Sequence, residues 1–475
     1  LVRSRGLGDV YKRQPLAWPA GPGLAAAQAA SAVRLFEARA RAADRAFVLD
    51  EDNVALVVSI CRQLDGVALA IELAAARVPH LGLQGLHDRL HQRLRVLATR
   101  ARDVPPRQRS MAAALEWSHA LLNGAEQSVL RRLAVMAGPF SPASAQAVAC
   151  AAVLGPGAVL DALGALVERS LVMATAPAAG AEPGLRLLET VRQFALERLA
   201  GAGEEAACRQ RHLERMVALA EQARGALAGP APGAALARLD AERDNLLAAL
   251  SGSGPTPEGA AQRLRMQLRL TVALHRWVLH RDGLAPARSA CAALAQPGAA
   301  TQGVLFGQTL WVLAELDAAL GDLEEAAQGL QRCAAVAQDC GDTALLVQAQ
   351  SSLGAVLVQQ GRHAEARRHL EEALATARGM AERPDLRIAA AQGLADLECA
   401  SGQPEAAQPL YEEALRLARA CGDRMATLGP LLGLCRAAPA PEPSERPLLL
   451  QRLAQAQALA DELDSAPARR WVMAA

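Results

Sequence analysis

Apolar residues recur with a helical period along most of this chain, and extended runs are confined to one short stretch. Over the first hundred residues the period predicts helices at residues 31–43, 54–64, 68–78 and 86–97. We expect Asp50 or Asp52 to cap the second of these helices, because either carboxylate can accept a backbone N–H. Gly66 would separate the second helix from the third, and Pro79 would end the third.

The pattern changes after the Pro105-Pro106 pair, which marks a boundary. Several helical periods are followed there by two short extended runs and one more helix, which Gly201 would end. The helical periods cover residues 111–122, 126–137, 142–149 and 158–169, the extended runs residues 171–174 and 185–188, and the last helix residues 190–199. Helices followed by a β-ribbon are typical of a winged-helix module.

A repeat beyond residue 301 is the strongest internal signal in the chain. The dipeptides Leu313-Ala314, Leu353-Gly354 and Leu394-Ala395 are each followed by a glycine, and these glycines (321, 361 and 402) lie 40 and 41 residues apart. Conserved sizes follow each glycine at fixed distances: Ala326, Ala366 and Ala407, then Leu330, Leu370 and Tyr411, then Cys333, Ala373 and Ala414. Each unit reads as a helix, a Gly turn and a second helix. Such pairs must stack to bury their apolar faces, and the pattern resembles long-spaced tetratricopeptide repeats.

Composition narrows the fold class to mainly α. Apolar residues make up 52% of the chain but aromatic residues only 3%, and the abundant Ala, Leu, Arg, Glu and Gln favour helices. A net charge of +1 gives no global argument for a polyanionic partner. No uncharged apolar run reaches the roughly 18 residues of a membrane span, so we expect no membrane partner. The nine scattered cysteines fit reduced thiols and a cytoplasmic location.

Six tracts, in one order, resemble the bacterial STAND-type regulators, which are ATPases of the AP-ATPase/NB-ARC class. The tracts are VRLFEA at 33–38, CRQLDGVALAIELAAARV at 61–78, SMAAALEWSHALL at 110–122, EQSVLRRLAVMAG at 126–138, residues 159–171, and LLETVRQFALERL at 187–199. LDAERDNLLAAL at 239–250 resembles the segment that opens this family's sensor. The resemblance runs from about residue 31 to residue 435. It implies a nucleotide domain, a winged helix and a repeat sensor in a transcriptional regulator.

The resemblance and the sequence pattern together divide the chain into six regions. They are an artefactual or disordered tail (1–14), the helical lid that ends a nucleotide-binding domain (15–104), the winged-helix domain (105–202), a helical linker that starts the sensor (203–300), tetratricopeptide-like repeats (301–435), and a Pro-rich linker with a terminal helix (436–475). The fold class expected is therefore mainly α: the end of an NTPase lid, a winged helix and an α-solenoid.

Departures from the family pattern bear on nucleotide binding. The family's Gly-Leu-Pro-Leu-Ala box appears here as GVALA, and the resemblance implies that Gly66, Val67, Ala68 and Leu69 are the adenine-side remnant of an ATP/ADP site. Ala68 stands where the family has a proline and offers a smaller contact. A phosphate loop of the form GxxxxGK[ST] is absent, because the single lysine, Lys12, is followed by arginine.

A second departure concerns the phosphate side of the same site. Relatives with a Met-His-Asp motif place the histidine near the nucleotide phosphates, and the matching residues here are Leu187, Leu188 and Glu189. Leu188 cannot donate a hydrogen bond to phosphate. We therefore expect this chain to be a non-catalytic fragment of a STAND-type regulator. ATP or ADP would serve the parent protein, and neither would bind well to this fragment.

The resemblance also implies partners, and two other functions stay open. A protein or small-molecule inducer would bind the repeat surface. A self-standing repeat adaptor is one alternative, and a DNA-binding winged helix that inserts residues 158–169 into the major groove is another. That segment offers Arg169 beside Glu168, with Asp161 earlier, whereas recognition helices present several donors to bases and phosphates. We therefore favour an internal role for the winged helix, with DNA contacted through an upstream module.

Three residue patterns that suggest chemistry have simpler explanations. His87 and His91 lie four residues apart and could bind a metal from one helix face, but no third ligand is evident, so we expect solvated histidines. Cys333 and Cys340 are seven residues apart on one helix, and we expect both to pack in the core. Trp117 precedes a serine for which no base can be named, and we expect it to anchor the winged-helix core.

Overall fold

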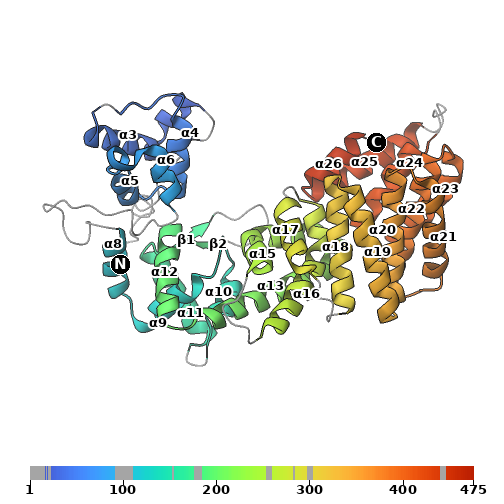
Figure 1. Ribbon diagram of the computed structural model, residues 1–475, viewed down its shortest axis with the longest axis horizontal. Coiled ribbons are helices and arrows are strands. Elements are labelled where there is room, and N and C mark those ends of the chain that lie inside the picture. Colours follow the sequence, from blue (N-terminus) through green and yellow to red (C-terminus); the bar gives the residue numbers. More distant parts are fainter. Residues whose placement is uncertain are drawn as a thin grey trace, which may run out of the picture. The chain divides into compact units, whose positions relative to one another are not determined.

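The computed structural model divides the chain into two compact units (Figure 1). Unit 1 comprises residues 1–176 and 183–209, and unit 2 comprises residues 177–182 and 210–475. The structure describes residues 16–474 except residues 18, 20–22, 46, 91–110, 152–153, 176–183, 253–258, 282–283, 297–302 and 439–445. The described residues are almost entirely helical, which confirms the expected fold class. None of the described helices has the length and apolar character that a bilayer crossing requires.

An N-terminal bundle of five helices occupies the first part of unit 1. Its helices are α2 (Leu24–Ala29), α3 (Ser31–Ala43), α4 (Val54–Gln63), α5 (Ala68–Ala75) and α6 (Val78–Arg89). Phe36, Ile60, Ile71 and Leu86 are fully buried and belong to one apolar core. These are the positions that the helical period marks as apolar, so the sequence pattern already identifies the buried face.

Two predicted helix boundaries in this bundle are wrong. Pro79 lies in the first turn of α6, where its fixed φ suits a helix and its missing N–H has no partner to lose. Residue 53 rather than an aspartate precedes α4, and the Asp50 carboxylate instead accepts the N–H groups of Asp52 and Asn53. The segment predicted as a helix over residues 86–97 lies partly in α6 and, beyond residue 90, outside the described residues.

The winged-helix domain completes unit 1 and follows the predicted order of helices and ribbon. Its elements are α8 (Met111–Ala120), α9 (Gly124–Leu133), α10 (Pro142–Ala149), α11 (Pro156–Glu168), β1 (Val172–Thr175), β2 (Gly184–Leu187) and α12 (Glu189–Gly201). The two strands are antiparallel, with Val172 opposite Leu187. Asn123 and Glu126 form a capping box at the start of α9, so the first free N–H groups of this helix are satisfied.

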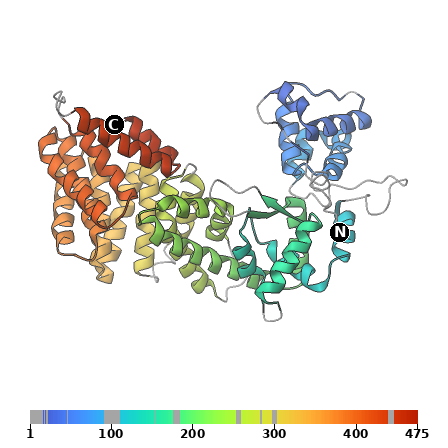
Figure 2. The same cartoon turned by 180° about the vertical axis from the view of Figure 1, so that it is seen from behind.

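Unit 2 is an array of helices that ends in a short C-terminal cap (Figures 1 and 2). Its elements are α13 (Glu205–Leu227), α14 (Pro232–Ala241), α15 (Arg243–Ser251), α16 (Ala260–Leu279), α17 (Leu284–Leu294), α18 (Val304–Leu320), α19 (Leu323–Cys340), α20 (Thr343–Gln359), α21 (His363–Arg378), α22 (Pro384–Ala400), α23 (Pro404–Ala420), α24 (Leu428–Arg436), α25 (Arg446–Glu462) and α26 (Ala466–Ala474). Helices α18 to α23 form three stacked pairs, which we call the repeat array; α25 and α26 form the C-terminal cap.

The repeat array has the geometry that its sequence repeat predicts. The turn glycines Gly321, Gly361 and Gly402 have φ angles of +94°, +75° and +76°, a region that favours glycine. The alanines five residues later and the larger residues nine later are all fully buried. A Cβ added to Gly354 would lie 2.4 Å from the Leu370 Cγ atom, so the small residue lets two helices pack closely.

The C-terminal cap packs back on the helices that begin the array. The Arg281 guanidinium donates to the carbonyl oxygens of Leu463 at 3.0 Å and Asp464 at 3.3 Å. The Ser465 hydroxyl lies 3.4 Å from the Nδ1 atom of His280. Arg276 on α16 also pairs with Asp423 at 2.7 Å, across almost the whole of unit 2 in sequence. The sequence pattern predicted α25 but not α26 or this closure.

Candidate functional site

The predicted adenine-side residues lie together in the turn between α4 and α5. Gly66 has φ +67°, Val67 precedes α5, and Ala68 and Leu69 begin it. The Gly66 carbonyl accepts the N–H of Leu16 at 2.8 Å, and a Cβ at this position would lie 2.3 Å from the Leu16 carbonyl oxygen. A glycine is therefore required by the close approach of another backbone segment. The Ala68 side chain is exposed.

Asp65, just before this turn, connects the N-terminal bundle to the winged-helix domain. Its carboxylate accepts the backbone N–H of Glu189 at 2.7 Å and lies 3.7 Å from the Arg186 guanidinium. Leu188 precedes α12 and makes no side-chain cap, so Asp65 caps this helix from a distant part of the chain, at the positive end of the helix dipole. Asp65 has φ +53°, which is uncommon for a residue with a side chain. We call Asp65, Arg186 and Glu189 the junction.

The tract matched to the Met-His-Asp motif supplies the winged-helix side of the junction. Leu187 and Leu188 are both buried, and neither side chain has a hydrogen-bond donor. The Glu189 carboxylate pairs with Arg192 at 2.7 Å. The residues described here therefore do not fit a nucleotide phosphate: two are buried aliphatic groups, and Arg186 faces Asp65.

Carboxylates inside the winged-helix domain bind several of its arginines. Glu204 accepts hydrogen bonds from Arg132 and Arg131, each at 2.9 Å, and these bonds lower the pKa of Glu204 to about 2. Arg132 also donates to the Ala149 carbonyl at 2.8 Å. Arg169, the one basic residue at the end of the proposed recognition segment, pairs with Glu126 of the capping box.

Helix α11 presents a face that does not suit DNA. Its sequence contains neither lysine nor arginine, and its exposed residues are small, apolar or acidic. They include Leu160, which is 45% exposed, and Asp161 and Glu168. Base edges and phosphates are normally read by several donor side chains. The described surface of α11 therefore favours a contact other than DNA.

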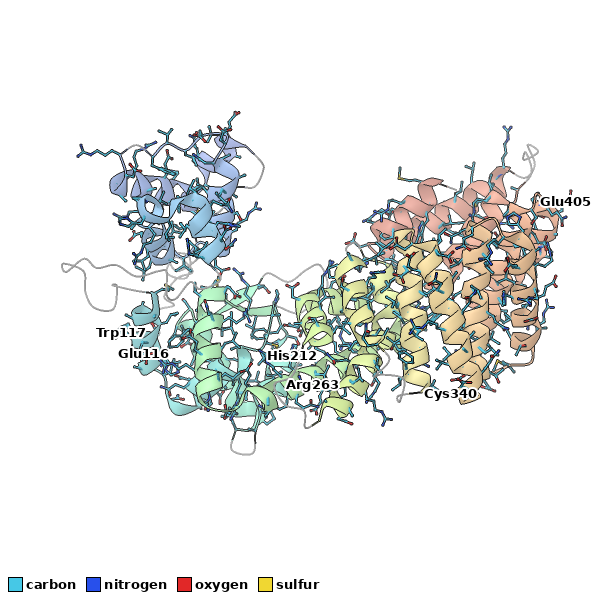
Figure 3. All side chains as sticks on the ribbon, viewed as in Figure 1. Glu116, Trp117, His212, Arg263, Cys340 and Glu405 are labelled. Atoms are coloured by element: carbon cyan, nitrogen blue, oxygen red, sulfur yellow. The ribbon has the colours of Figure 1, made fainter. Side chains whose placement is uncertain are left out.

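The remaining candidate residues divide between confirmed and wrong predictions. His87 Nε2 lies 2.8 Å from the Gln63 amide and 3.0 Å from the Ser59 hydroxyl; His91 lies outside the described residues, which contain no metal-binding group of three. Cys333 is buried, but Cys340 is exposed near the end of α19, so core packing holds for only one of the two (Figure 3). Trp117 does not anchor the core: it is 49% exposed on α8 (Figure 3), because the buried face of that helix carries Met111 and Leu115.

Sequence reasoning missed two features. Asp65 lies inside a recognised tract, and an acidic residue before the Gly turn is a signal, but its partner is 124 residues away in sequence. A cavity of about 530 Å³ in unit 2 is the other, and its lining includes Arg436 and Trp471. No local pattern brings these residues together, since the C-terminal cap was predicted only in part.

Comparison with known families identifies two domains. Residues 122–200 match the winged helix-turn-helix domain, and residues 306–379 match the tetratricopeptide repeat. The first match covers α9 to α12 with the β-ribbon, and the second covers α18 to α21. The predicted winged-helix and repeat architecture is thereby confirmed.

Relatives of known name extend over most of the chain. Proteins of Mycobacterium tuberculosis and Mycobacterium bovis that carry the name "Putative HTH-type transcriptional regulator" are 35% identical over 402 residues, 83% of this chain and 44% of their own length. An uncharacterized protein of Mycobacterium tuberculosis is 41% identical over 174 residues, 36% of this chain and 44% of its own length. The chain thus spans less than half the length of these relatives. Their names agree with the regulator family that the sequence resembles.

One solved structure is similar over 94% of this chain and 61% of its own, at 14% identity and a TM-score of 0.37. It is a Signal Transduction ATPase with Numerous Domains (STAND) protein with a tetratricopeptide repeat sensor, from Pyrococcus horikoshii.

Proposed function

We propose that this chain is the relay and sensor portion of a signal-responsive transcriptional regulator of the STAND type. A protein or small-molecule inducer binds the repeat array, and the winged-helix domain passes the resulting change to the N-terminal bundle through the junction. The relatives named as transcriptional regulators support the overall role. The winged-helix and tetratricopeptide matches support the division into relay and sensor.

The observation that carries the relay role is the single carboxylate of Asp65. It holds the first turn of α12 and faces Arg186 on β2, so two recognised tracts meet at one side chain. A contact of this kind is readily broken and re-formed, because it consists of one charge-assisted hydrogen bond and one longer ion pair. An inducer shifts the population between closed and open junctions by its different affinity for the two states.

The proposal assigns no catalysis to this chain. ATP or ADP would serve the whole regulator, with its phosphates held by residues that this sequence does not contain. The absence of a GxxxxGK[ST] motif supports this view, as do the buried Leu187 and Leu188. Gly66, Val67, Ala68 and Leu69 then form the base of a site that needs further residues.

The winged-helix domain acts within the protein in this proposal, and DNA is contacted through another module. The acidic and apolar face of α11 supports this choice over direct DNA binding. A self-standing repeat adaptor would keep the repeat array but would leave the junction without a role.

Isothermal titration calorimetry of the chain with ATP and ADP, each with magnesium, tests the proposal. We expect no saturable binding below millimolar nucleotide. The Asp65→Ala variant serves as a second arm, because it opens the junction without touching residues 66–69. Micromolar affinity in either protein would contradict the proposal, since it would show a complete nucleotide site in this chain.

A further inference from the structure

A cavity of about 530 Å³ lies within unit 2, where the C-terminal cap meets the helices of the array. Its lining comes from the ends of α16 and α20, from α22 and α24, and from α26. In Figures 1 and 2, α26 lies beside α25, over α17 and α18. Pockets for small organic ligands typically have volumes of roughly 300–1,000 Å³. The cavity therefore has the size of a small-molecule site.

One side of the cavity is apolar and closely built. Met425, Leu428 and Leu432 lie along it, from the segment that leads into α24 and from α24 itself. A Cβ added to Gly429 would lie 2.5 Å from the amide of Gln392. Glycine at this position lets the Gln392 amide reach the apolar wall. The wall offers dispersion contacts to an apolar ligand body, with one polar group at its edge.

The other side of the cavity carries hydrogen-bond donors that the protein leaves available. The amides of Gln359 and Gln392 have no hydrogen-bond partner among the described residues. The Trp471 ring is 48% exposed and lies 6.0 Å from the His280 ring, edge to face. An exposed indole beside two amides and an apolar wall is the usual composition of a ligand site.

Arg436 carries the positive charge of the lining. The neighbouring His280 is neutral at physiological pH, because burial, helped by Arg276 and Arg281, lowers its pKa to about 4. Those two arginines pair with Asp423 and Asp240, outside the lining.

A buried network holds Arg436 in place. Its guanidinium donates to Asp396 at 3.0 Å, and Asp396 also accepts the Tyr411 hydroxyl at 2.6 Å. The Arg436 side chain is nevertheless 54% exposed, so further N–H groups remain for a ligand. A fixed guanidinium with free N–H groups suits a carboxylate, which it can bind through two parallel hydrogen bonds.

We propose that this cavity binds a small organic carboxylate with an apolar or aromatic body. The carboxylate lies at Arg436 and the two glutamine amides, and the body lies between Trp471 and the wall of Met425, Leu428 and Leu432. This inference rests on the proposed sensor role of the repeat array and names the chemical class of its inducer. The Trp471 ring comes from the C-terminal cap, so a bound ligand joins the cap to the array.

Calorimetric titration of the intact chain with defined probes tests the proposal. The probes are phenylbutyrate, octanoate and indoleacetate, with phenylbutanol and phenylbutylamine as neutral and cationic matches for the first. We expect phenylbutyrate and at least one other acid to bind with dissociation constants below a millimolar. Phenylbutanol should bind about tenfold more weakly, as the loss of a charged hydrogen bond predicts. The amine should not bind.

Variants separate a binding role of Arg436 from a structural one. Arg436→Gln should weaken phenylbutyrate binding about tenfold and leave phenylbutanol binding unchanged. Asp396→Asn removes the structural partner of Arg436 but keeps its charge, so the acid should still bind. Arg416→Gln, on the exposed face of α23, is the matched control and should change nothing.

Three results would overturn the inference: none of the acids binds, the amine binds as tightly as the acid, or Arg436→Gln leaves acid binding unchanged. Such a result with nucleotide still unbound removes this inference and leaves the proposed function intact. Micromolar ATP binding removes the proposed function, whatever the acids do.

Discussion

The winged-helix domain and the repeat unit place their arginines in different surroundings. In the winged-helix domain, Arg131 and Arg132 converge on Glu204, and Arg169 pairs with Glu126. In unit 2, Arg436 is held by Asp396 but keeps more than half of its side chain exposed in a cavity, beside two amides without protein partners. The first region satisfies its charged groups internally, whereas the second leaves donors for a ligand.

This difference shows why the name of a domain does not fix its role. A helix-turn-helix suggests DNA binding, yet the described surface of α11 is small, apolar and acidic. A repeat array suggests a protein partner, yet the C-terminal cap of this one helps to form a cavity of small-molecule size. In both regions, the positions of the carboxylates decide which arginines are available.

Leu370→Ala should have the largest effect of the substitutions considered. Leu370 is fully buried between the small residues Gly354 and Gly393, which cannot refill the space. The free energy of unfolding of unit 2 should fall by about 3 kcal/mol in urea titrations followed by tryptophan fluorescence. Leu320→Ala, at a position 44% exposed, should change it by less than about 0.5 kcal/mol. Equal losses in the two variants would contradict the packing described for the array.

Glu204→Gln should destabilise unit 1 by about 2 kcal/mol at neutral pH, because Arg132 keeps its buried position but loses a charged partner. The folded-state pKa of Glu204, about 2, is below its ordinary value of 4.5. The stabilisation is therefore present above pH 4.5 and is lost as the pH falls towards 2. The variant should lack this pH dependence in thermal unfolding.

Glu197→Gln, on the exposed side of α12, is the control for this experiment. It should leave both the stability and its acid dependence unchanged. The internal use of the winged-helix arginines would be contradicted if Glu204→Gln behaved in the same way.

Asp65→Ala should cost about 1 kcal/mol, the usual effect of removing a helix cap. Hydrogen exchange should become faster at the Glu189 amide, which donates to Asp65, and should stay unchanged in unit 2. Asp52→Ala removes an exposed aspartate of the same bundle and should not affect the Glu189 amide. Unchanged protection at Glu189 in the Asp65 variant would show that the junction does not form.

The smallest expected effect concerns DNA. In gel-shift assays the intact chain should show no salt-dependent binding, and Asp161→Asn on α11 should not create any. A shift that weakens with salt and becomes stronger in Asp161→Asn would place α11 on DNA and remove the contrast drawn between the two regions.

The sequence predicted the repeat array most accurately, because its period fixes both the turn glycines and the buried alanines. Gly361 has the left-handed φ expected of it, and Ala366 is fully buried. Helix boundaries in the N-terminal bundle were less certain, since Pro79 can end one helix or begin the next. The placement of Trp117 failed because the helical period of α8 is weak in a segment rich in alanine.

The junction and the cavity could not be predicted from local patterns. Asp65 and Glu189 are far apart in sequence, and a cap supplied by a distant residue has no periodic signature. Arg436 and Trp471 line one cavity only because α26 packs back on the array. Gly66, Val67, Ala68 and Leu69 were recognised by resemblance, and the structure explains the glycine through its contact with Leu16.

Hydrogen exchange of the intact chain, measured with phenylbutyrate and separately with ATP and magnesium, tests the contrast between the two regions most directly. We predict that phenylbutyrate slows exchange in α24 and α26, while ATP slows exchange neither in the turn at Gly66 nor at the start of α12. Protection by ATP at Gly66 or Glu189, with none by phenylbutyrate in unit 2, would contradict the account.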